Sequence, residues 1–228
     1  MMSRRTQCLI AKTGRNPRGF LFVLEGIDGS GKSCACSRLK RRLTKEGYDV
    51  LQLREPTNES QWGKEIRARS PRGELSPSEE LELFIRDREW NIHNRILPAL
   101  DSGRLVLMDR YFFATGAYQS GATGVPWQEI LRRNREDIHA PEPDVVFILD
   151  VDAEVGLARA TKRENRANLQ FERLDRLVKV RQAYLEIAKH DSGNFRIVNA
   201  GNSLDAVVAE IHSEIIQTVK CRENQSQE

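Results

Sequence analysis

The sequence predicts an α/β fold, in which a five-stranded parallel sheet carries helices on both faces and a mobile lid. Five short apolar runs alternate with stretches of helical periodicity along the 228 residues. Strands that alternate with helices form βαβ units with parallel strands. The first run ends in a glycine-rich loop, which is typical of a tight passage from strand to helix. A chain of this length can bury a sizeable core, so we expect one domain.

The first three predicted elements form one βαβ unit. Phe20–Leu24 is apolar throughout and predicts a buried strand. A helix is expected over Ser33–Gly47, because Gly47 stands where a C-terminal cap belongs. The second strand is expected at Tyr48–Leu53.

The middle of the chain predicts a long helix and two further strands. Ser76-Pro77-Ser78-Glu79 matches a capping box with proline at the first helical position. Apolar residues at helical spacing extend this helix to about Leu100. The third and fourth strands are expected at Arg104–Met108 and Asp144–Leu149.

The last third of the chain begins with a cationic segment. Asp152 is expected to cap a helix that runs into residues 159–173, which hold several arginines and few apolar residues. Such a segment suits a lid that closes over a substrate, although a solvated charged helix has the same composition. A helix over Leu174–Ala188, an edge strand over Asn194–Asn199 and a helix over Ser203–Val219 complete the predicted fold.

These elements place one domain at residues 20–221, with a disordered basic extension at 1–19 and a frayed tail at 222–228. The extension also resembles an organellar targeting peptide in charge, but it shows little amphipathic periodicity. The 36 Lys and Arg against 33 Asp and Glu leave a net charge of +3, which is too small to predict a nucleic-acid partner. No apolar run has the length of a membrane span, so we expect no membrane partner.

The four cysteines lack the spacing of a zinc site or of a disulfide framework. Reduced thiols are typical of the cytoplasm, where we expect the protein to reside. Cys34 and Cys36 follow the glycine-rich loop, and either ordinary packing or a lowered thiol pKa would fit that position.

The glycine-rich loop has the spacing of a phosphate-binding P-loop, Gly26-x-x-x-x-Gly31-Lys32-Ser33. Its glycines let backbone N–H groups converge on phosphate oxygens, the lysine adds a cation, and the serine hydroxyl is a ligand for Mg²⁺. A strand before the loop and a helix after it are the context that this motif requires, which favours it over an ordinary glycine-rich turn. The candidate nucleotide-binding residues are Gly26, Ile27, Asp28, Gly29, Ser30, Gly31, Lys32 and Ser33.

Charged residues follow two of the predicted strands. Arg54 ends the second strand, and Asp109 and Arg110 follow the third. Ligands of open parallel sheets bind beyond the carboxyl ends of the strands, so arginine here suits an anion and the acid suits a P-loop Mg²⁺. The alternatives are a surface ion pair from Arg54 to Glu55 or Glu59, and an Asp109 that only caps the next helix.

The long predicted helix carries the pattern Phe84-x-x-Asp87-Arg88. One helical turn brings the ring of Phe84 and the guanidinium of Arg88 to the same side. This pair could stack on a nucleobase and bond its edge. A core phenylalanine beside a solvated arginine is the alternative.

Together these patterns resemble the thymidylate kinases, the P-loop nucleoside-monophosphate kinases that convert dTMP to dTDP. The resemblance runs from about Phe20 to Val219. The motifs stand in the family's order, as FVLEGIDGSGKS, REP, LF-x-x-DR, ILPAL, DRY, AYQ, PDVVFILDV, EVGLAR and FE. No single motif is specific for this family, but the whole set in this order is.

The resemblance implies sites for ATP, Mg²⁺ and an acceptor nucleotide. Gly29–Ser33 would hold the ATP phosphates, with Ser33 and Asp109 beside the metal. Asp28 would accept a hydrogen bond from the sugar 3′-hydroxyl, and Arg54 and Arg110 would clamp the acceptor phosphate.

The resemblance also assigns the base and sugar contacts and implies a homodimer. Phe84 would stack on thymine, Arg88 would bond the edge of the base, and Gln119 would lie near it. Phe171 would lie near the sugar 2′-position and favour deoxyribose.

The chain departs from the family pattern in its lid and beside the base pocket. Gly29 stands where some members carry a P-loop arginine, and Leu169-Gln170 replaces the Asp-Arg pair that usually ends the lid. Arg86 replaces a small residue and would place a bulky cation near the base pocket, which leaves the base preference open. The expected catalytic residues are Lys32, Asp109 and the lid arginines, with Arg163 the first choice before Arg159 and Arg166.

These patterns predict ATP-dependent phosphorylation of dTMP to dTDP in dTTP synthesis. A kinase for another pyrimidine monophosphate is one alternative. A non-catalytic nucleotide-binding member of the family is another, because Gln170 stands where the family has arginine. A guanine-nucleotide switch is disfavoured, since the chain lacks an Asn-Lys-x-Asp run.

Overall fold

The computed structural model describes residues 19–164 and 170–225. Within them, five strands form one parallel sheet in the order β2-β3-β1-β4-β5. The strands are β1 (Phe20–Glu25), β2 (Val50–Arg54), β3 (Leu105–Asp109), β4 (Val145–Asp150) and β5 (Phe195–Asn199). The predicted five-stranded α/β sheet is therefore confirmed. Every strand lies within two residues of its predicted position, and β5 is at the edge as expected.

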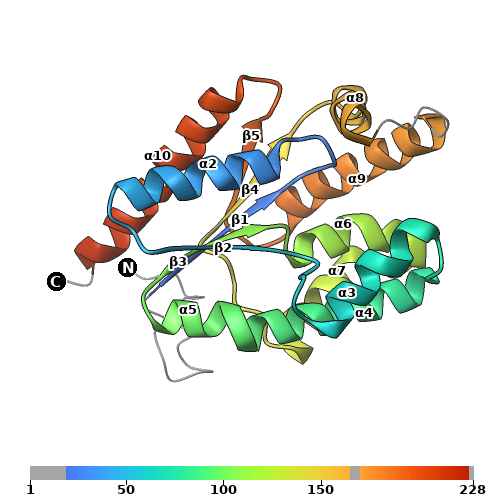
Figure 1. Cartoon of the computed structure of the whole chain (residues 1–228), viewed down its shortest axis with the longest axis horizontal. Helices are drawn as coiled ribbons and strands as arrows, with labels where there is room; N and C mark the ends of the chain where they lie inside the picture. Colours follow the sequence, from blue (N-terminus) through green and yellow to red (C-terminus); the bar gives the residue numbers. More distant parts are fainter. Residues whose placement is uncertain (1–18, 165–169, 226–228) are drawn as a thin grey trace.

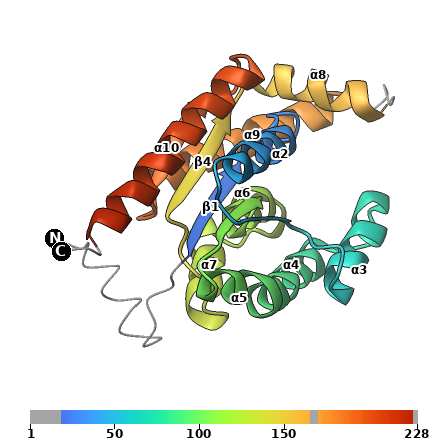
Figure 2. The ribbon, with the colours of Figure 1, turned by 60° about the vertical axis from the view of Figure 1, so that its left-hand side comes forward.

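Helices cover both faces of the sheet, as Figures 1 and 2 show. On one face, α2 (Lys32–Lys45) packs on β1, β2 and β3, and α10 (Leu204–Gln225) packs on α2 and β5. On the other face, α5 (Leu97–Asp101) packs on β3 and α9 (Gln170–His190) packs on β4. All six residues of β1 are buried, because this central strand is covered from both sides.

The helix that was expected to be continuous from Ser76 to Leu100 changes its winding along the way. It consists of α4 (Pro77–Asn91), one π-helical turn η2 (Ile92–Ile96) and α5. The N–H of Leu97 bonds to the carbonyl of Ile92, five residues back. Pro98 has no N–H for Asn94 and its ring crowds that carbonyl, so the helix widens before it. The capping box is confirmed, with Ser76 and Glu79 bonding each other's backbone N–H.

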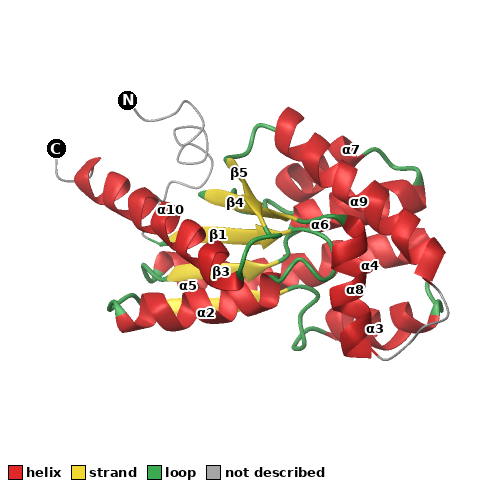
Figure 3. Ribbon diagram, turned by 90° about the horizontal axis from the view of Figure 1, so that it is seen from above, coloured by secondary structure: helices red, strands yellow, loops and turns green. Residues whose placement is uncertain are grey.

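Several short helices near the ends of the strands were not predicted. They are α3 (Gln61–Arg69), the 3₁₀ turn η1 (Ser70–Arg72), α6 (Phe112–Thr123), α7 (Trp127–Arg132) and the π turn η3 (Arg133–Asp137). α8 (Ala153–Glu164) begins directly after Asp152. Figure 3 shows α3, α6 and α8 gathered toward the end of the sheet to which the strand arrows point. The helices α3, α6 and α8 therefore lie near the carboxyl ends of the strands.

The C-terminal segment does not fray where the sequence predicted it. α10 continues to Gln225, and Arg222 donates from Nη1 to the carbonyl of Gly19 at 2.9 Å. The same guanidinium pairs with Asp144 and lies over the ring of Phe20 at 4.0 Å. These contacts tie the end of α10 to the start of β1. The predicted disorder of residues 1–18 and of residues 226–228 lies outside the described residues.

None of the helices in the described part of the chain has the length and apolar character of a membrane span. The buried apolar side chains form a hydrophobic core between the sheet and the helices that pack on it.

Candidate active site

The P-loop lies between β1 and α2, where two glycines adopt left-handed backbone conformations. Gly29 has a φ of 79°, and a Cβ there would lie 2.0 Å from the carbonyl oxygen of Gly156, so only glycine fits. Gly31 precedes the first residue of α2 with a φ of 95°, and a Cβ there would meet nothing within 4 Å. The helix N-terminus therefore opens onto free space that a phosphate can occupy.

Lys32 is buried, and its ammonium group bonds only neutral oxygens. Nζ donates to the carbonyls of Gly26 and Ile27 at 2.9 and 2.8 Å and to Oγ of Ser30 at 3.2 Å. Burial, with the charge of Arg110 second, lowers the pKa of Lys32 to about 7. A phosphate placed beside Nζ would favour the charged form and reverse this shift.

Ser33 and Asp109 supply two oxygens that suit a P-loop Mg²⁺. Oγ of Ser33 donates to Oδ2 of Asp109 at 2.6 Å, and Arg54 Nε lies 3.8 Å from the same oxygen. Arg54 and Asp109 are register partners on β2 and β3. Mg²⁺ in such sites is held by one or two protein oxygens together with waters and phosphates, so this pair fits it. No cluster of three or more His, Cys, Asp and Glu side chains suits a metal within residues 19–164 and 170–225.

These contacts speak against the two structural alternatives that the sequence left open at the strand ends. Asp109 does not cap α6, which begins after Tyr111. Arg54 does not pair with Glu55 or Glu59, because Arg88 pairs with Glu55 and Arg95 with Glu59.

Arg110 is fixed by its backbone as well as by its side chain. It adopts a φ of 73°, and Nη2 donates to Oδ1 of Asp28 at 2.5 Å. Its guanidinium lies over the ring of Tyr118 at 4.8 Å. Oε1 of Glu25 accepts from the N–H groups of Tyr111 and Ala114, at 2.8 and 3.1 Å, and so holds the turn that follows Arg110.

Glu25 is fully buried between β1, this turn and α9. Its second oxygen accepts a hydrogen bond from the hydroxyl of Tyr184 at 2.9 Å. Burial raises the pKa of Glu25 to about 7, against the opposing charge of Arg110. Sequence reasoning missed this residue, although a glutamate inside an apolar strand is itself a signal.

A pocket of about 270 Å³ opens beside the P-loop. Its lining includes five of the residues predicted to hold the acceptor nucleotide: Asp28, Phe84, Arg88, Arg110 and Gln119. They come from the P-loop, α4, the end of β3 and α6. Phe84 is half-buried and faces the pocket rather than the core. Arg54 lies next to Asp109 and is not part of this lining.

Arg88 is 1% exposed, and its guanidinium is fixed by three neighbours. Nε and Nη2 contact Glu55 at 2.8 and 2.7 Å, Nη1 donates to Asn134 at 2.7 Å, and Nη2 donates to Thr115 at 3.0 Å. A guanidinium has five N–H groups, and partners among the described residues accept from four of them. The remaining N–H, on Nη1, is available to a ligand in the pocket.

Gln119 is oriented by a carboxylate that also lines the pocket. Its Nε2 donates to Oε2 of Glu80 at 3.3 Å, and the Ser70 hydroxyl donates to the other oxygen of Glu80. A carboxylate only accepts hydrogen bonds, so the NH₂ group of Gln119 faces Glu80 and its Oε1 remains an acceptor. Sequence reasoning missed Glu80 and Ser70, since Gln119 and Ser70 lie on α6 and η1, which it did not predict.

Asp87, next to Arg88, fixes the loop that follows β2. It accepts from the N–H and hydroxyl of Thr57 at 2.8 and 2.6 Å and from the hydroxyl of Ser60 at 2.5 Å. This buried carboxylate therefore joins α4 to the loop between β2 and α3.

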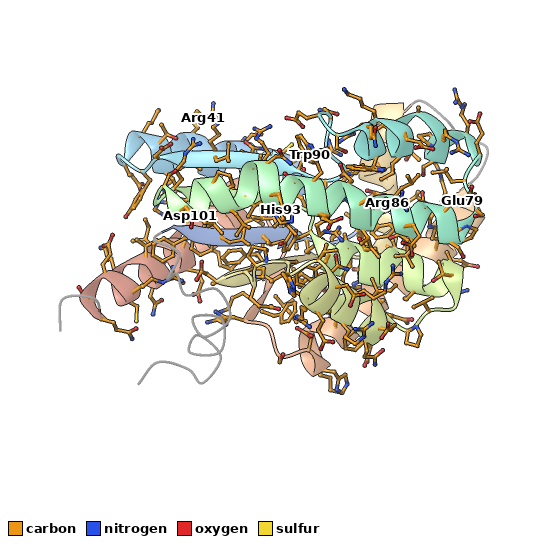
Figure 4. The ribbon with its side chains drawn as sticks, turned by 90° about the horizontal axis from the view of Figure 1, so that it is seen from below. Arg41, Glu79, Arg86, Trp90, His93 and Asp101 are labelled. Atoms are coloured by element: carbon orange, nitrogen blue, oxygen red, sulfur yellow. The ribbon has the colours of Figure 1, made fainter. Side chains whose placement is uncertain are left out.

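Arg86 does not crowd the base pocket, contrary to the expectation from the sequence. Its side chain is exposed and does not line the pocket. Figure 4 views α4 and α5 from the outer face that carries Arg86, Trp90 and His93. Arg86 and Arg88 are two residues apart, so helical geometry turns them to different faces.

The lid arginines are only partly described. Nη1 of Arg159 donates to the carbonyl of Ala200 at 2.9 Å. Arg163 lies in the last turn of α8 and Phe171 at the start of α9, but their side chains lie outside the described residues. Arg166 lies outside them altogether.

Cys36 is a packing residue rather than a reactive thiol. Its side chain is buried under β3, and burial raises the pKa of the thiol well above its usual value. Cys36 and Cys221 are free cysteines.

The chain is similar to proteins of one family along most of its length. The family model described as thymidylate kinase matches residues 24–211. The chain is 41% identical to a protein named probable thymidylate kinase from Archaeoglobus fulgidus, over 90% of this chain and 98% of the relative. It is 39% identical to a thymidylate kinase of Xanthomonas euvesicatoria pv. vesicatoria, over 90% and 87% of the two chains, and 36% identical to one of Desulfotalea psychrophila, over 90% and 98%. The chain therefore belongs to the thymidylate kinase family of nucleoside-monophosphate kinases.

Proposed function

We propose that this chain phosphorylates dTMP to dTDP with Mg²⁺-bound ATP as donor, and that the pocket beside the P-loop holds dTMP. Membership of the thymidylate kinase family supports the reaction, which supplies dTTP synthesis. The observation that carries the assignment of the pocket is the convergence of Asp28, Phe84, Arg88, Arg110 and Gln119 on one cavity next to the P-loop.

On the donor side, the P-loop Gly26–Ser33 binds the ATP phosphates. The N–H groups at the start of α2 lie beside the open space at Gly31, and the ammonium of Lys32 is held against the loop by the carbonyls of Gly26 and Ile27. Ser33 and Asp109 hold Mg²⁺, which neutralises charge on the phosphates when it is bound. Phosphoryl transfer depends mainly on positioning and charge stabilisation, so Lys32 is expected to contribute about a hundredfold or more to the rate.

On the acceptor side, Arg110 and Arg54 bind the phosphate of dTMP. Arg110 is the better ordered of the two, because Asp28 and the Tyr118 ring fix its guanidinium. Arg54 is more exposed and lies beside the metal site. Asp28 accepts a hydrogen bond from the sugar 3′-hydroxyl, and Phe171 favours deoxyribose at the 2′-position.

The base is selected by the polarity of the pocket. Phe84 stacks on the ring, the free N–H of Arg88 donates to a carbonyl, and Oε1 of Gln119 accepts from a ring N–H. Thymine offers the O4 carbonyl beside N3–H, whereas cytosine offers an amino group beside an unprotonated N3. A pocket with these donors and acceptors rejects cytosine, because its polar groups would be left unpaired.

The catalytic arginine is assigned to the lid, with Arg163 the first choice before Arg166. Arg159 is the weakest candidate of the three, because it already bonds the carbonyl of Ala200. We also propose that the protein is a homodimer, which the family resemblance supports, and that it is cytoplasmic, because reduced thiols such as those of Cys36 and Cys221 are typical of that compartment. Light scattering of the purified protein would test the dimer.

The test of this function is ADP release from Mg-ATP with dTMP, dUMP, UMP, dCMP, AMP, GMP and thymidine, with Lys32→Ala as the blank. We expect turnover with dTMP that disappears in the blank. Turnover that favours another monophosphate would overturn the thymidylate assignment. ATP binding without turnover on any acceptor would favour a non-catalytic family member.

A further inference from the structure

Arg176 lies on α9 and lines the acceptor pocket, although no motif of the sequence pointed to it. It stands two helical turns after Gln170, the first residue of the helix, and it is exposed. The pocket therefore has an arginine on the wall formed by α9 as well as those at the end of β3 and on α4.

Two guanidinium groups flank one aromatic ring in this wall. The ring of Tyr118 lies 4.8 Å from the guanidinium carbon of Arg110 and 5.8 Å from that of Arg176. The hydroxyl of Tyr118 accepts from the backbone N–H of Asp28 at 3.2 Å and from Arg110 at 3.4 Å. Arg176 consequently lies close to the Asp28–Arg110 pair, where the acceptor phosphate is proposed to bind.

Three cations act on Asp28 at this wall of the pocket. Burial alone would raise the pKa of Asp28, but the charges of Arg110, Lys32 and Arg176 hold it below its usual value. The carboxyl group of Glu25 also faces Lys32 and Arg110, and that of Asp109 also faces Lys32. A phosphate monoester carries close to two negative charges at neutral pH, and an arginine on each side of Tyr118 can help to neutralise them.

The guanidinium of Arg176 is also available. Among the described residues no carboxylate forms an ion pair with it. Arg181, little more than one turn further along α9, differs in this respect because it pairs with both Asp150 and Asp152. Because no carboxylate of the described residues is ion-paired with it, this pocket-lining arginine is suited to an anionic ligand.

We propose that Arg176 binds the phosphate of the acceptor nucleotide together with Arg110. This inference rests on the proposed function, because it takes the pocket as the acceptor site. In this proposal Arg176 binds the phosphate of the nucleotide and does not contact the nucleoside part.

The test compares Arg176→Gln with Lys179→Gln, which removes an exposed cation from the same helix away from the pocket. For each variant and the wild type, calorimetry gives the Kd of dTMP, and competition gives the inhibition constant of thymidine. We expect Arg176→Gln to weaken dTMP binding tenfold or more while thymidine changes less than twofold. Lys179→Gln should leave both values unchanged, and Arg176→Lys should recover part of the dTMP affinity.

Equal losses for dTMP and thymidine would overturn the inference, because Arg176 would then shape the pocket rather than bind phosphate. Unchanged dTMP binding in Arg176→Gln would overturn it as well. Failure of the proposed function would be seen in a different experiment, the acceptor assay, in which the wild-type enzyme would prefer another monophosphate. The same comparison of nucleotide with nucleoside then applies to that acceptor.

Discussion

Arg110 adopts a left-handed conformation that few residues other than glycine adopt, and Glu25 stabilises the turn that follows it. The glutamate reaches this turn from the last position of β1, and Tyr184 of α9 bonds its second oxygen. One buried carboxyl group thereby joins the P-loop strand, the turn that follows Arg110 and the helix that carries Arg176. We infer that Glu25 positions Arg110 without touching the substrate.

The protonation of Glu25 makes stability depend on pH. Its folded-state pKa of about 7 lies above the usual 4.5, so between these values the folded chain keeps a proton that the unfolded chain releases. The contribution of this proton to the free energy of unfolding is fully present below pH 4.5 and is lost as the pH rises toward 7. Glu25→Gln cannot titrate and keeps the same shape.

We therefore expect the unfolding free energy of Glu25→Gln, relative to wild type, to rise by up to about 3 kcal/mol between pH 4.5 and 7. Urea unfolding at pH 5, 6 and 7 measures it. A difference that stays constant over this range would show that Glu25 is ionised throughout.

Glu80 is expected to determine the choice of base through Gln119. In Glu80→Gln the partner can accept or donate, so the amide of Gln119 can turn and offer its NH₂ group to cytosine. The ratio of kcat/KM for dTMP over dCMP should fall at least tenfold, mainly through a gain with dCMP. Glu82→Gln, on the same helix but paired with Arg133, is the control and should keep the wild-type ratio. An unchanged ratio in Glu80→Gln would rule out this role.

At the level of the elements, the P-loop is packed against the first turn of α8. A Cβ on Gly156 would lie 2.8 Å from the carbonyl oxygen of Asp28 and 2.8 Å from the side chain of Ile27. The carbonyl belongs to the backbone of the loop and cannot move without displacing the phosphate-binding N–H groups. α8 therefore supports the shape of the P-loop, in addition to leading into the lid.

Gly156→Ala is accordingly expected to weaken Mg-ATP binding tenfold or more, as measured by calorimetry. Gly121→Ala is the matched control, because a Cβ at this exposed position of α6 would meet nothing within 4 Å. It should leave ATP affinity unchanged and stabilise the fold by about 1 kcal/mol at most. Equal ATP affinity in both variants would show that the P-loop tolerates the added methyl group.

The elements that the sequence predicted are those with a clear periodicity. The strands are apolar runs between turn signals, and α4 has a capping box. α6 was missed because FFATGAYQSGAT is apolar or small on every side and shows no helical stripe. α3 was missed because QWGKEIRAR is short and contains a glycine. Contacts that depend on these helices, such as Gln119 with Glu80, could not be inferred from one sequence.

At the scale of the whole molecule, the order of the strands in the sheet brings the residues of the candidate site together. β1 lies between β3 and β4, and the register pairs Leu24 and Arg54 with Asp109. The P-loop, Asp109, Arg54 and Arg110 thus meet at one edge of the sheet. Residues attached to strand ends were predictable, because parallel strands bring their carboxyl ends together. The orientation of Arg86 was not predicted, since it depends on which face of α4 packs inward.

The central claim, that this pocket selects dTMP, is tested most directly by competition. The enzyme is given dTMP, dUMP and dCMP in equal amounts with limiting Mg-ATP, and the diphosphates are separated by chromatography. Their initial ratio gives the relative kcat/KM values in one vessel. We predict that dTDP dominates and that dCDP is the least abundant. Dominance of dCDP or dUDP would contradict the account, because the donors and acceptors of the pocket would then not govern the choice of base.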